Sequence, residues 1–239
     1  MSKLADTTAV ILAGGLGTRL RSVVPGVPKV LAAVSGRPFL TYLLDQLGFY
    51  GIREAVLCTG YLGDQIRDKI GDRYGSHLHL KYSQEEQPLG TGGAVRQALG
   101  LCNSDPVLVM NGDSYVEVDL IGFLRWFCQG GVEAALVLSK MPDTSRYGRV
   151  EVGEGGLITG FVEKRASDGP GWINSGIYLL RQNVLLSLPE GQFSSLERDL
   201  FPRLASEARL YGYPTAGKFI DIGTPESYLL VEEFFGTTV

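Results

Sequence analysis

The sequence contains little cysteine and little histidine, with three and two residues respectively among 239. Cys58, Cys102 and Cys128 lie far apart and form neither a CxxC metal pattern nor a disulfide framework. We therefore expect reduced thiols, as is usual in the cytosol. His77 and His79 alternate along an expected strand without a metal-binding partner pattern, so we assign them no catalytic role.

The chain also lacks a dense run of lysine or arginine, and no apolar stretch approaches the ~20 residues that a membrane helix needs. Its formal charge of −4 argues against electrostatic binding to nucleic acid or to a membrane surface. The first residues carry one lysine and an apolar run too short for a signal peptide. These absences predict a cytoplasmic protein that binds small ligands, without a nucleic-acid or membrane partner.

What the sequence does contain is an alternation of short β-branched runs with amphipathic stretches, which is typical of βαβ units around a parallel sheet. After residue 140 the pattern changes to glycine-punctuated β segments and then to helices. We expect one α/β domain over residues 1–239, with a substrate-facing β subregion at about 140–182. The expected strands are 9–13, 55–59, 78–83, 107–110, 134–138, 148–152, 157–163 and 172–180, and the expected helices are 38–49, 63–70, 92–99, 120–128, 195–204 and 225–235.

The most informative segment is the stretch ILAGGLGTRLRSVVPGVPKVL, at residues 11–31. Its glycines allow the backbone to approach a phosphate or a base closely, and Arg19 and Lys29 supply the positive charge that a polyphosphate requires. A dinucleotide-binding fingerprint would need a glycine where Leu20 stands, and a Walker loop would need Gly-Lys-Ser/Thr. For a bare GxG, a simple tight turn between strand and helix remains the alternative.

The spacing GGxGTRL…PK is the signature of the sugar-phosphate nucleotidyltransferases, and this sequence closely resembles that family, most of all its D-glycero-D-manno-heptose 1-phosphate guanylyltransferases. Further similar segments follow in the expected order: QEEQPLGTGGA, VMNGDSY, RYGRV, FVEK, WINSGIYLL, SSLERDLFP and FIDIGTPESY. The resemblance implies a Rossmann-like, GT-A-like fold with a mixed sheet, in which the nucleotide lies over the carboxyl ends of the strands. The C-terminal left-handed β-helix that is frequent in the family has no counterpart here.

Two acidic residues are the expected metal ligands. Asp113 follows the expected strand 107–110, and Asp221 stands in the apolar run FIDIG, where a carboxylate is costly without an ion or hydrogen bonds. By the resemblance, both hold Mg²⁺, which favours a few carboxylates together with phosphate oxygens. The alternatives are a helix cap or Asx turn for Asp113 and a cap of the helix near Thr224 for Asp221.

The implied reaction needs no protein nucleophile, because the sugar phosphate oxygen attacks the α-phosphorus and pyrophosphate leaves. By the resemblance, the catalytic residues are Arg19, which binds the β- and γ-phosphates, Lys29, which binds the α-phosphate, and Asp113. The protein then catalyses the reaction by positioning the substrates and stabilising the charge that develops. The expected nucleotide-binding residues are Leu12, Ala13, Gly14, Gly15, Gly17, Thr18, Arg19, Lys29, Glu85, Gly90, Thr91, Gly112 and Asp113.

Glu85 stands where uridylyl and thymidylyl relatives tend to carry glutamine. Guanine presents two adjacent donors, which a carboxylate accepts together, whereas the other bases present a mixed edge that an amide matches better. Glu85 therefore favours guanine. The alternative is that Glu85 and Glu86 are acidic residues of a surface loop, and that backbone groups of Leu12, Ala13 and Gly90 read the base.

The sugar 1-phosphate site is assigned by resemblance alone. The expected contacts are Gly148, Glu163, Asn174 and Gly176 for the hydroxyls and Lys164 for the phosphate. Three further residues are considered without a fixed role: Arg146 and Tyr147 as residues that shape the pocket, and Trp172 as a stacking residue or part of the apolar core.

The resemblance implies transfer of GMP from GTP to a sugar 1-phosphate, with D-glycero-alpha-D-manno-heptose 1-phosphate as the expected acceptor and a surface polysaccharide (capsule, lipopolysaccharide or S-layer glycan) as the destination. Mannose 1-phosphate or another sugar 1-phosphate is the enzymatic alternative. A non-catalytic regulatory subunit that senses nucleotide sugars is the alternative from another class. Loss of Arg19, Lys29, Asp113 or Asp221 would favour it, and all four are present. The oligomeric state stays open, with a homodimer considered.

Overall fold

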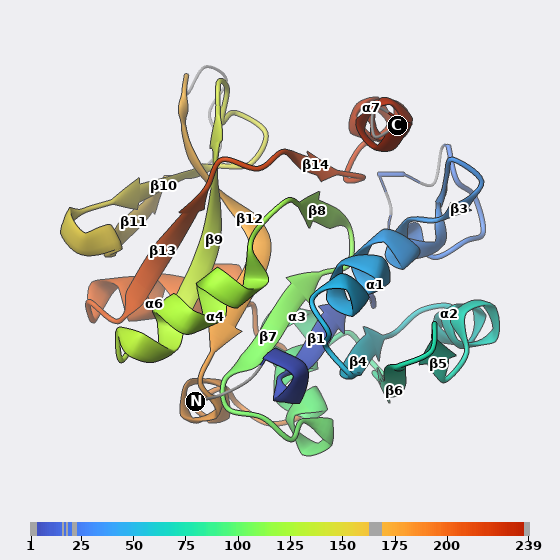
Figure 1. The fold of residues 1–239 in the computed structure, drawn as a ribbon, viewed down its shortest axis with the longest axis horizontal. Helices are drawn as coiled ribbons and strands as arrows, with labels where there is room; N and C mark the ends of the chain where they lie inside the picture. Colours follow the sequence, from blue (N-terminus) through green and yellow to red (C-terminus); the bar gives the residue numbers. More distant parts are fainter. Residues whose placement is uncertain (1–3, 16, 18, 21–22, 163–168, 237–239) are drawn as a thin grey trace.

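The computed structural model describes residues 4–15, 17, 19–20, 23–162 and 169–236. Over this part of the chain a mixed sheet forms the centre of the molecule (Figure 1). Its strands run in the order β11-β10-β12-β7-β1-β4-β6-β5, with β9 beside β12 and β13 beside β9. The strands are β1 (Thr8–Leu12), β4 (Glu54–Thr59), β5 (Arg73–Tyr74), β6 (Leu78–Gln84), β7 (Val107–Asn111), β9 (Ala134–Met141), β10 (Arg149–Val152), β11 (Ile158–Val162), β12 (Gly171–Leu180) and β13 (Leu210–Thr215).

The first half of the chain builds the parallel part of this sheet. Strand β1 pairs in parallel with β4 and β7, and β4 pairs in parallel with β6. The two faces are covered by different helices, so alternate residues of one strand enter different cores: Ile11 packs with α1 (Phe39–Phe49) and α4 (Leu120–Gln129), while Val10 packs with α3 (Gly90–Ala98) and α6 (Phe201–Ser206). Burial on both faces explains the continuous apolar runs that predict these strands.

The strand expected at 134–138, for which the sequence named no partner, is β9. It pairs with β12 and with β13, and not with β7. The end of β12 runs antiparallel to β7 and lies between β7 and β9, with Tyr178 opposite Val109 on one side and Leu136 on the other. The expected β subregion therefore supplies a strand of the central sheet, because the hydrophobic end of β12 is buried there.

Several short elements carry too few residues to show a sequence period. Strands β8 (Ser114–Val116) and β14 (Phe219–Asp221) form a small antiparallel ladder, as do β2 (Ala33–Val34) and β3 (Arg37–Pro38). The expected helix 195–204 is a π-helical turn, η5 (Leu196–Leu200), continued by α6. The remaining helices are α2 (Gly63–Ile70), α5 (Gln182–Leu186) and α7 (Pro225–Gly236), with 3-10 turns η1 (Leu4–Asp6), η2 (Lys29–Leu31), η3 (Leu99–Leu101) and η4 (Glu154–Gly156).

The mixed α/β architecture expected from the sequence, with a largely parallel first half of the central sheet, is confirmed. Within the described ranges, none of the helices has the length and apolar character needed to cross a lipid bilayer.

Candidate active site

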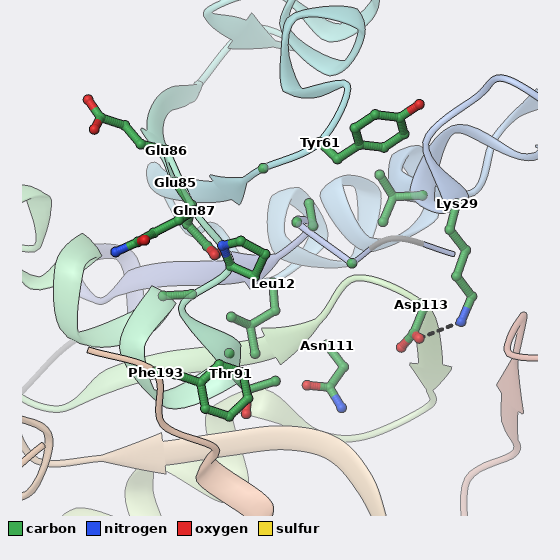
Figure 2. A pocket seen from close by; sticks show the side chains of 18 residues that line it. Leu12, Lys29, Tyr61, Glu85, Glu86, Gln87, Thr91, Asn111, Asp113 and Phe193 are labelled. Carbon is green, nitrogen blue, oxygen red and sulfur yellow. Dashed lines mark hydrogen bonds and ion pairs between the residues drawn. The ribbon is translucent and has the colours of Figure 1, made fainter. Parts of the chain in front are cut away.

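Two cavities open at the carboxyl ends of the parallel strands and share one wall. The first has a volume of about 660 Å³ and the second about 700 Å³. The shared wall consists of Gly15, Lys29, Asn111 and Asp113. Figure 2 shows the first cavity, which is also lined by Leu12, Ala13, Gly14, Val30, Gly60, Tyr61, Glu85, Glu86, Gln87, Pro88, Gly90, Thr91, Ala94 and Phe193. The second is also lined by Gly17, Arg19, Leu20, Ser114, Arg146, Tyr147, Asn174, Ser175, Gly176, Phe219, Asp221, Gly223 and Thr224.

The glycine loop leaves the sheet directly after β1. The backbone N–H of Ala13 donates to the carbonyl of Cys58 at 2.8 Å, so the strand ladder holds the start of the loop. A Cβ on Gly14 would lie 3.2 Å from Oε1 of Glu85 and 3.3 Å from the nitrogen of Gly60. Glycine at this position therefore lets two distant segments, the loop after β1 and the loop after β6, close around the same space.

Glu85 is half-buried at this junction. One carboxylate oxygen accepts a hydrogen bond from the backbone N–H of Leu89 at 2.8 Å, while the other faces Gly14. Burial raises the pKa of the Glu85 carboxyl above its ordinary value, and the hydrogen bond from Leu89 partly opposes that rise. Glu85 thus supports its loop and also presents an oxygen to the first cavity. Glu86 is exposed and points away from the other labelled side chains (Figure 2).

The start of α3 is covered by Phe193 and Ser194, of which only Ser194 belongs to a segment singled out in the sequence, as the first residue of SSLERDLFP. Phe193 lines the first cavity beside Thr91 (Figure 2), and the carbonyl of Ser194 accepts hydrogen bonds from the N–H groups of Gly92 and Gly93. A Cβ on Gly92 would lie 2.7 Å from Oγ of Ser194, so the repeated glycines in this turn make room for the segment. No hydrophobic period in the sequence marks Phe193. Only the structure shows that this large apolar side chain is 57% exposed and lines the first cavity.

Thr91 was expected to donate to the nucleotide, and its side chain is engaged elsewhere. The hydroxyl donates to Glu197 at 2.6 Å and accepts from the backbone N–H of Leu196 at 2.9 Å. The side chain therefore joins α3 to η5, although Thr91 still lines the first cavity.

Lys29 and Asp113 meet at the shared wall. Nζ of Lys29 lies 2.5 Å from Oδ2 of Asp113, and the pair is marked by the dashed line in Figure 2. The Lys29 side chain is mostly buried, whereas that of Asp113 is 43% exposed toward the cleft. In the absence of anionic ligand, the amine is neutralised by the carboxylate. A polyphosphate would therefore compete with Asp113 for the amine of Lys29, and a cation would compete with Lys29 for the carboxylate of Asp113.

Asp221 is brought beside Asp113 by the β8–β14 ladder. Asp221 is paired with Ser114, and the N–H of Ile222 donates to the carbonyl of Asp113 at 2.9 Å. One Asp221 oxygen accepts from the hydroxyl of Tyr147 at 2.6 Å and from Arg146 at 3.3 Å. The other accepts from the N–H of Gly223 at 2.5 Å and from the hydroxyl of Ser227 at 3.1 Å.

These contacts decide between the interpretations of Asp221. The hydroxyl of Thr224, not the carboxylate of Asp221, accepts from the N–H of Ser227 in the first turn of α7. Asp221 is therefore not the cap of that helix. Burial and, after it, the hydrogen bond to Asp221 raise the pKa of the Tyr147 hydroxyl well above its ordinary value, so Tyr147 remains a donor to this carboxylate.

The protein supplies only some of the ligands that a magnesium ion needs. Among the described residues, no group of three or more His, Cys, Asp and Glu side chains gathers around one point. Two carboxylates, Asp113 just before β8 and Asp221 at the end of β14, are nevertheless held side by side, and Mg²⁺ commonly takes its other ligands from phosphate oxygens and water. The residues present therefore suit an ion that arrives with a phosphorylated ligand.

The remaining expected sugar-site residues divide into three groups. Asn174 and Gly176 line the second cavity, and a Cβ on Gly176, whose φ is 81°, would lie 2.5 Å from Oγ of Ser114. Gly148 lines neither cavity, although its neighbours Arg146 and Tyr147 line the second. Thr18, Glu163 and Lys164 lie outside the described residues.

The other expected residues are placed as follows. Arg19 is exposed and lines the second cavity together with Gly17. Gly112 donates to the carbonyl of Leu12 at 2.9 Å, and a Cβ on Gly112 would lie 2.5 Å from that oxygen, so its role is to let β7 and β1 end side by side. Trp172 packs against the apolar core on the α3 side of the sheet, as the alternative reading of that residue predicts.

Comparison with known proteins gives consistent matches over the whole chain. A family model described as Nucleotidyl transferase matches residues 8–237. A mannose-1-phosphate guanylyltransferase from Mycobacterium tuberculosis is 34% identical over 223 residues, which are 92% of this chain and 62% of that protein. This chain thus spans less than two thirds of the mycobacterial protein. A D-glycero-alpha-D-manno-heptose 1-phosphate guanylyltransferase from Aneurinibacillus thermoaerophilus is 35% identical over 220 residues, 92% of this chain and 94% of the relative.

Solved structures agree with these matches. HddC from Yersinia pseudotuberculosis, complexed with GMP-PN, superimposes with a TM-score of 0.85 at 34% identity and covers 96% of this chain and 99% of its own. A UTP-bound UGPase from Acinetobacter baumannii gives a TM-score of 0.81 at 21% identity, which shows a shared fold alone.

Proposed function

The chain belongs to the nucleotidyl transferase family, and we propose that it transfers GMP from GTP to a sugar 1-phosphate and releases pyrophosphate. The resemblance inferred from the sequence motifs is thereby confirmed at the level of the family. In this proposal the first cavity takes the nucleotide and the second takes the sugar 1-phosphate. Their shared wall, with Lys29 and Asp113, is where the two phosphates meet.

The observation that carries the choice of base is the position of Glu85. Its free carboxylate oxygen faces Gly14 in the first cavity, while the other oxygen holds Leu89. An ionised carboxylate offers about four acceptor sites, so the bond to Leu89 leaves capacity for the two donors of guanine. The neighbouring walls, formed by Leu12, Ala94 and Phe193, are apolar and suit the faces of a purine.

The reacting groups are positioned by charge. Lys29 lies at the shared wall and can exchange its contact with Asp113 for an α-phosphate oxygen, which stabilises the charge that develops there. We assign Arg19, exposed at the second cavity, to the outer phosphates. Asp113 and Asp221 would hold Mg²⁺, which when bound neutralises phosphate charge. Tyr147, Arg146, Gly223 and Ser227 fix the direction of the Asp221 carboxylate.

We propose a D-glycero-alpha-D-manno-heptose 1-phosphate as the acceptor and mannose 1-phosphate as its competitor. Relatives of both names match at nearly the same identity, 35% and 34%. Two relatives named for the heptose 1-phosphate each match at 35% identity, and they support the heptose as the first choice. Asn174, together with the backbone around Gly176, provides the polar contacts for sugar hydroxyls.

The direct test is pyrophosphate release by the purified protein with Mg²⁺, measured for each of GTP, UTP, dTTP and ATP against heptose, mannose and glucose 1-phosphates. The proposal predicts the highest kcat/KM for GTP with the heptose 1-phosphate. A higher kcat/KM with mannose 1-phosphate would correct the acceptor only. Absence of pyrophosphate with every pair, while GDP-sugars bind, would instead favour the regulatory subunit.

A further inference from the structure

Asn111 carries a buried polar atom that the protein leaves unpaired. It is the last residue of β7, opposite Leu12 at the end of β1, and it lies in the wall shared by both cavities. Its side-chain oxygen Oδ1 is buried and has no hydrogen-bond partner among the described residues. A buried acceptor without a donor destabilises a protein, so its retention at a ligand site calls for a donor on the ligand.

Strand geometry places this side chain on the α3 side of the sheet. Residues of a strand alternate between faces, so Asn111 shares the face of Val107 and Val109, which pack in the same core as Val95 of α3 and Tyr178 of β12. This is the side on which Thr91 and Phe193 form the wall of the first cavity.

The two ends of the amide face different surroundings. The nitrogen Nδ2 lies on the side of β12, where a Cβ on Gly176 would be 3.0 Å from it, and the Asn111 side chain also contacts the buried Tyr178 hydroxyl. Asn174 donates to that same hydroxyl at 3.1 Å. The oxygen consequently points the other way, toward Thr91 and Phe193 (Figure 2).

The position along the cavity identifies the ligand group. In Figure 2, Asn111 lies between Glu85, proposed to read the base, and the Lys29–Asp113 pair, proposed to meet the phosphates. The part of a nucleotide between base and phosphates is the ribose. An amide oxygen accepts only from a donor, and the ribose hydroxyls are donors whereas phosphate oxygens are not.

We propose that Oδ1 of Asn111 accepts a hydrogen bond from the 2′- or the 3′-hydroxyl of the ribose of the bound nucleoside triphosphate, so that Asn111 makes the enzyme discriminate against the analogue that lacks that hydroxyl. The inference rests on the proposed function, because it takes the first cavity as the nucleotide site. An amide suits this position better than a carboxylate, since it offers an acceptor without adding a negative charge beside Asp113 and the phosphates.

The test is the affinity for GTP, 2′-deoxy-GTP and 3′-deoxy-GTP by calorimetry, without sugar phosphate. One of the two deoxy analogues should bind the unmodified protein about tenfold more weakly than GTP. Asn111→Ala should weaken GTP by a similar factor and abolish the difference between GTP and that analogue. Asn111→Asp, which keeps an acceptor, should bind all three nucleotides more weakly but retain the difference.

The matched control is Asn174→Ala, which removes the other amide from Tyr178 but lies in the second cavity. It should retain the ribose preference, so loss of the preference only at Asn111 separates direct contact from disturbance of Tyr178. Equal affinity of the unmodified protein for all three nucleotides, or a preference that survives Asn111→Ala, overturns the inference while leaving the proposed function intact. Failure of the unmodified protein to bind any nucleoside triphosphate overturns both.

Discussion

The two cavities that meet at Lys29 and Asp113 are built in different ways. The first is made mainly from two short stretches that directly follow parallel strands, residues 12–15 after β1 and residues 85–91 after β6. The second collects residues from six separate parts of the chain, none of which dominates, and its carboxylate, Asp221, is held by four donors: Arg146, Tyr147, Gly223 and Ser227. The first cavity thus depends on local backbone geometry, and the second depends on long-range contacts around one carboxylate.

The largest effect is expected where the two cavities join. We expect most turnover to be lost in Asp113→Ala, in Asp221→Ala and after removal of divalent metal by EDTA. In each case the negative charges of the two substrates' phosphates would no longer be neutralised where they meet. Pyrophosphate release as a function of Mg²⁺ concentration measures this, with thermal unfolding to show that the variants are folded. Asp64→Ala, at an exposed position of α2, is the control. Near-normal activity of either variant would remove that carboxylate from the metal site.

Lys29 belongs to both cavities, so its loss should affect both substrates. Removing one preorganised charge contact to a transition state costs ~3 kcal/mol, and we expect Lys29→Ala to lower kcat/KM by about 100-fold or more. Steady-state kinetics with each substrate varied in turn gives the comparison, and Lys69→Ala, on the exposed side of α2, is the control. Unchanged kinetics would mean that Lys29 forms an ion pair with Asp113 but does not contact the phosphates.

The dependence of the first cavity on backbone geometry predicts a stability effect at Gly92. A Cβ there would lie 2.7 Å from Oγ and 3.1 Å from the carbonyl oxygen of Ser194. Gly92→Ala should lower the free energy of unfolding by about 1–3 kcal/mol, since the covering segment must move. Gly100→Ala, where a Cβ meets no atom within 4 Å, should cost less. Urea unfolding of the two variants decides, and equal losses would show that the segment yields freely.

The smallest effect is expected from trimming the Asp221 network. Tyr147→Phe removes one of its four donors and should raise KM for the sugar 1-phosphate by about fivefold, because one hydrogen bond contributes ~1 kcal/mol. The affinity for GTP, measured alone by calorimetry, should stay unchanged. An equal loss for both substrates would mean that the cavities are not independent.

The same division explains how much could be predicted. The parallel strands and their helices follow from hydrophobic periodicity, and the glycine loop and Asp113 stand just after strands that the pattern locates. Lys29, at the start of η2, was identified by its spacing from the glycines. The antiparallel insertion of β12 between β7 and β9 could not be predicted, because pairing partners are set by burial across the sheet and not by local period. The hydrogen bond from Tyr147 to Asp221, the position of Phe193 and the engagement of Thr91 with Glu197 likewise depend on contacts between distant segments.

The central claim is that the first cavity selects guanine through Glu85. Burial raises the pKa of the Glu85 carboxyl, so lowering the pH should protonate it, and reduce kcat/KM for GTP, at a higher pH than for an ordinary glutamate. This loss at acidic pH, the acidic limb of the profile, should be absent in Glu85→Gln. The exposed neighbour provides a matched control, Glu86→Gln, which should retain both the efficiency and the limb.

The most direct measurement is kcat/KM for GTP and for UTP, each determined for the unmodified protein, Glu85→Gln and Glu86→Gln. Glutamine places a donor against a guanine donor, so Glu85→Gln should lose GTP efficiency by about tenfold or more, while its use of UTP should fall less or rise. Glu86→Gln should match the unmodified protein. Equal losses for GTP and UTP in Glu85→Gln, or a preference of the unmodified protein for UTP, would contradict the account.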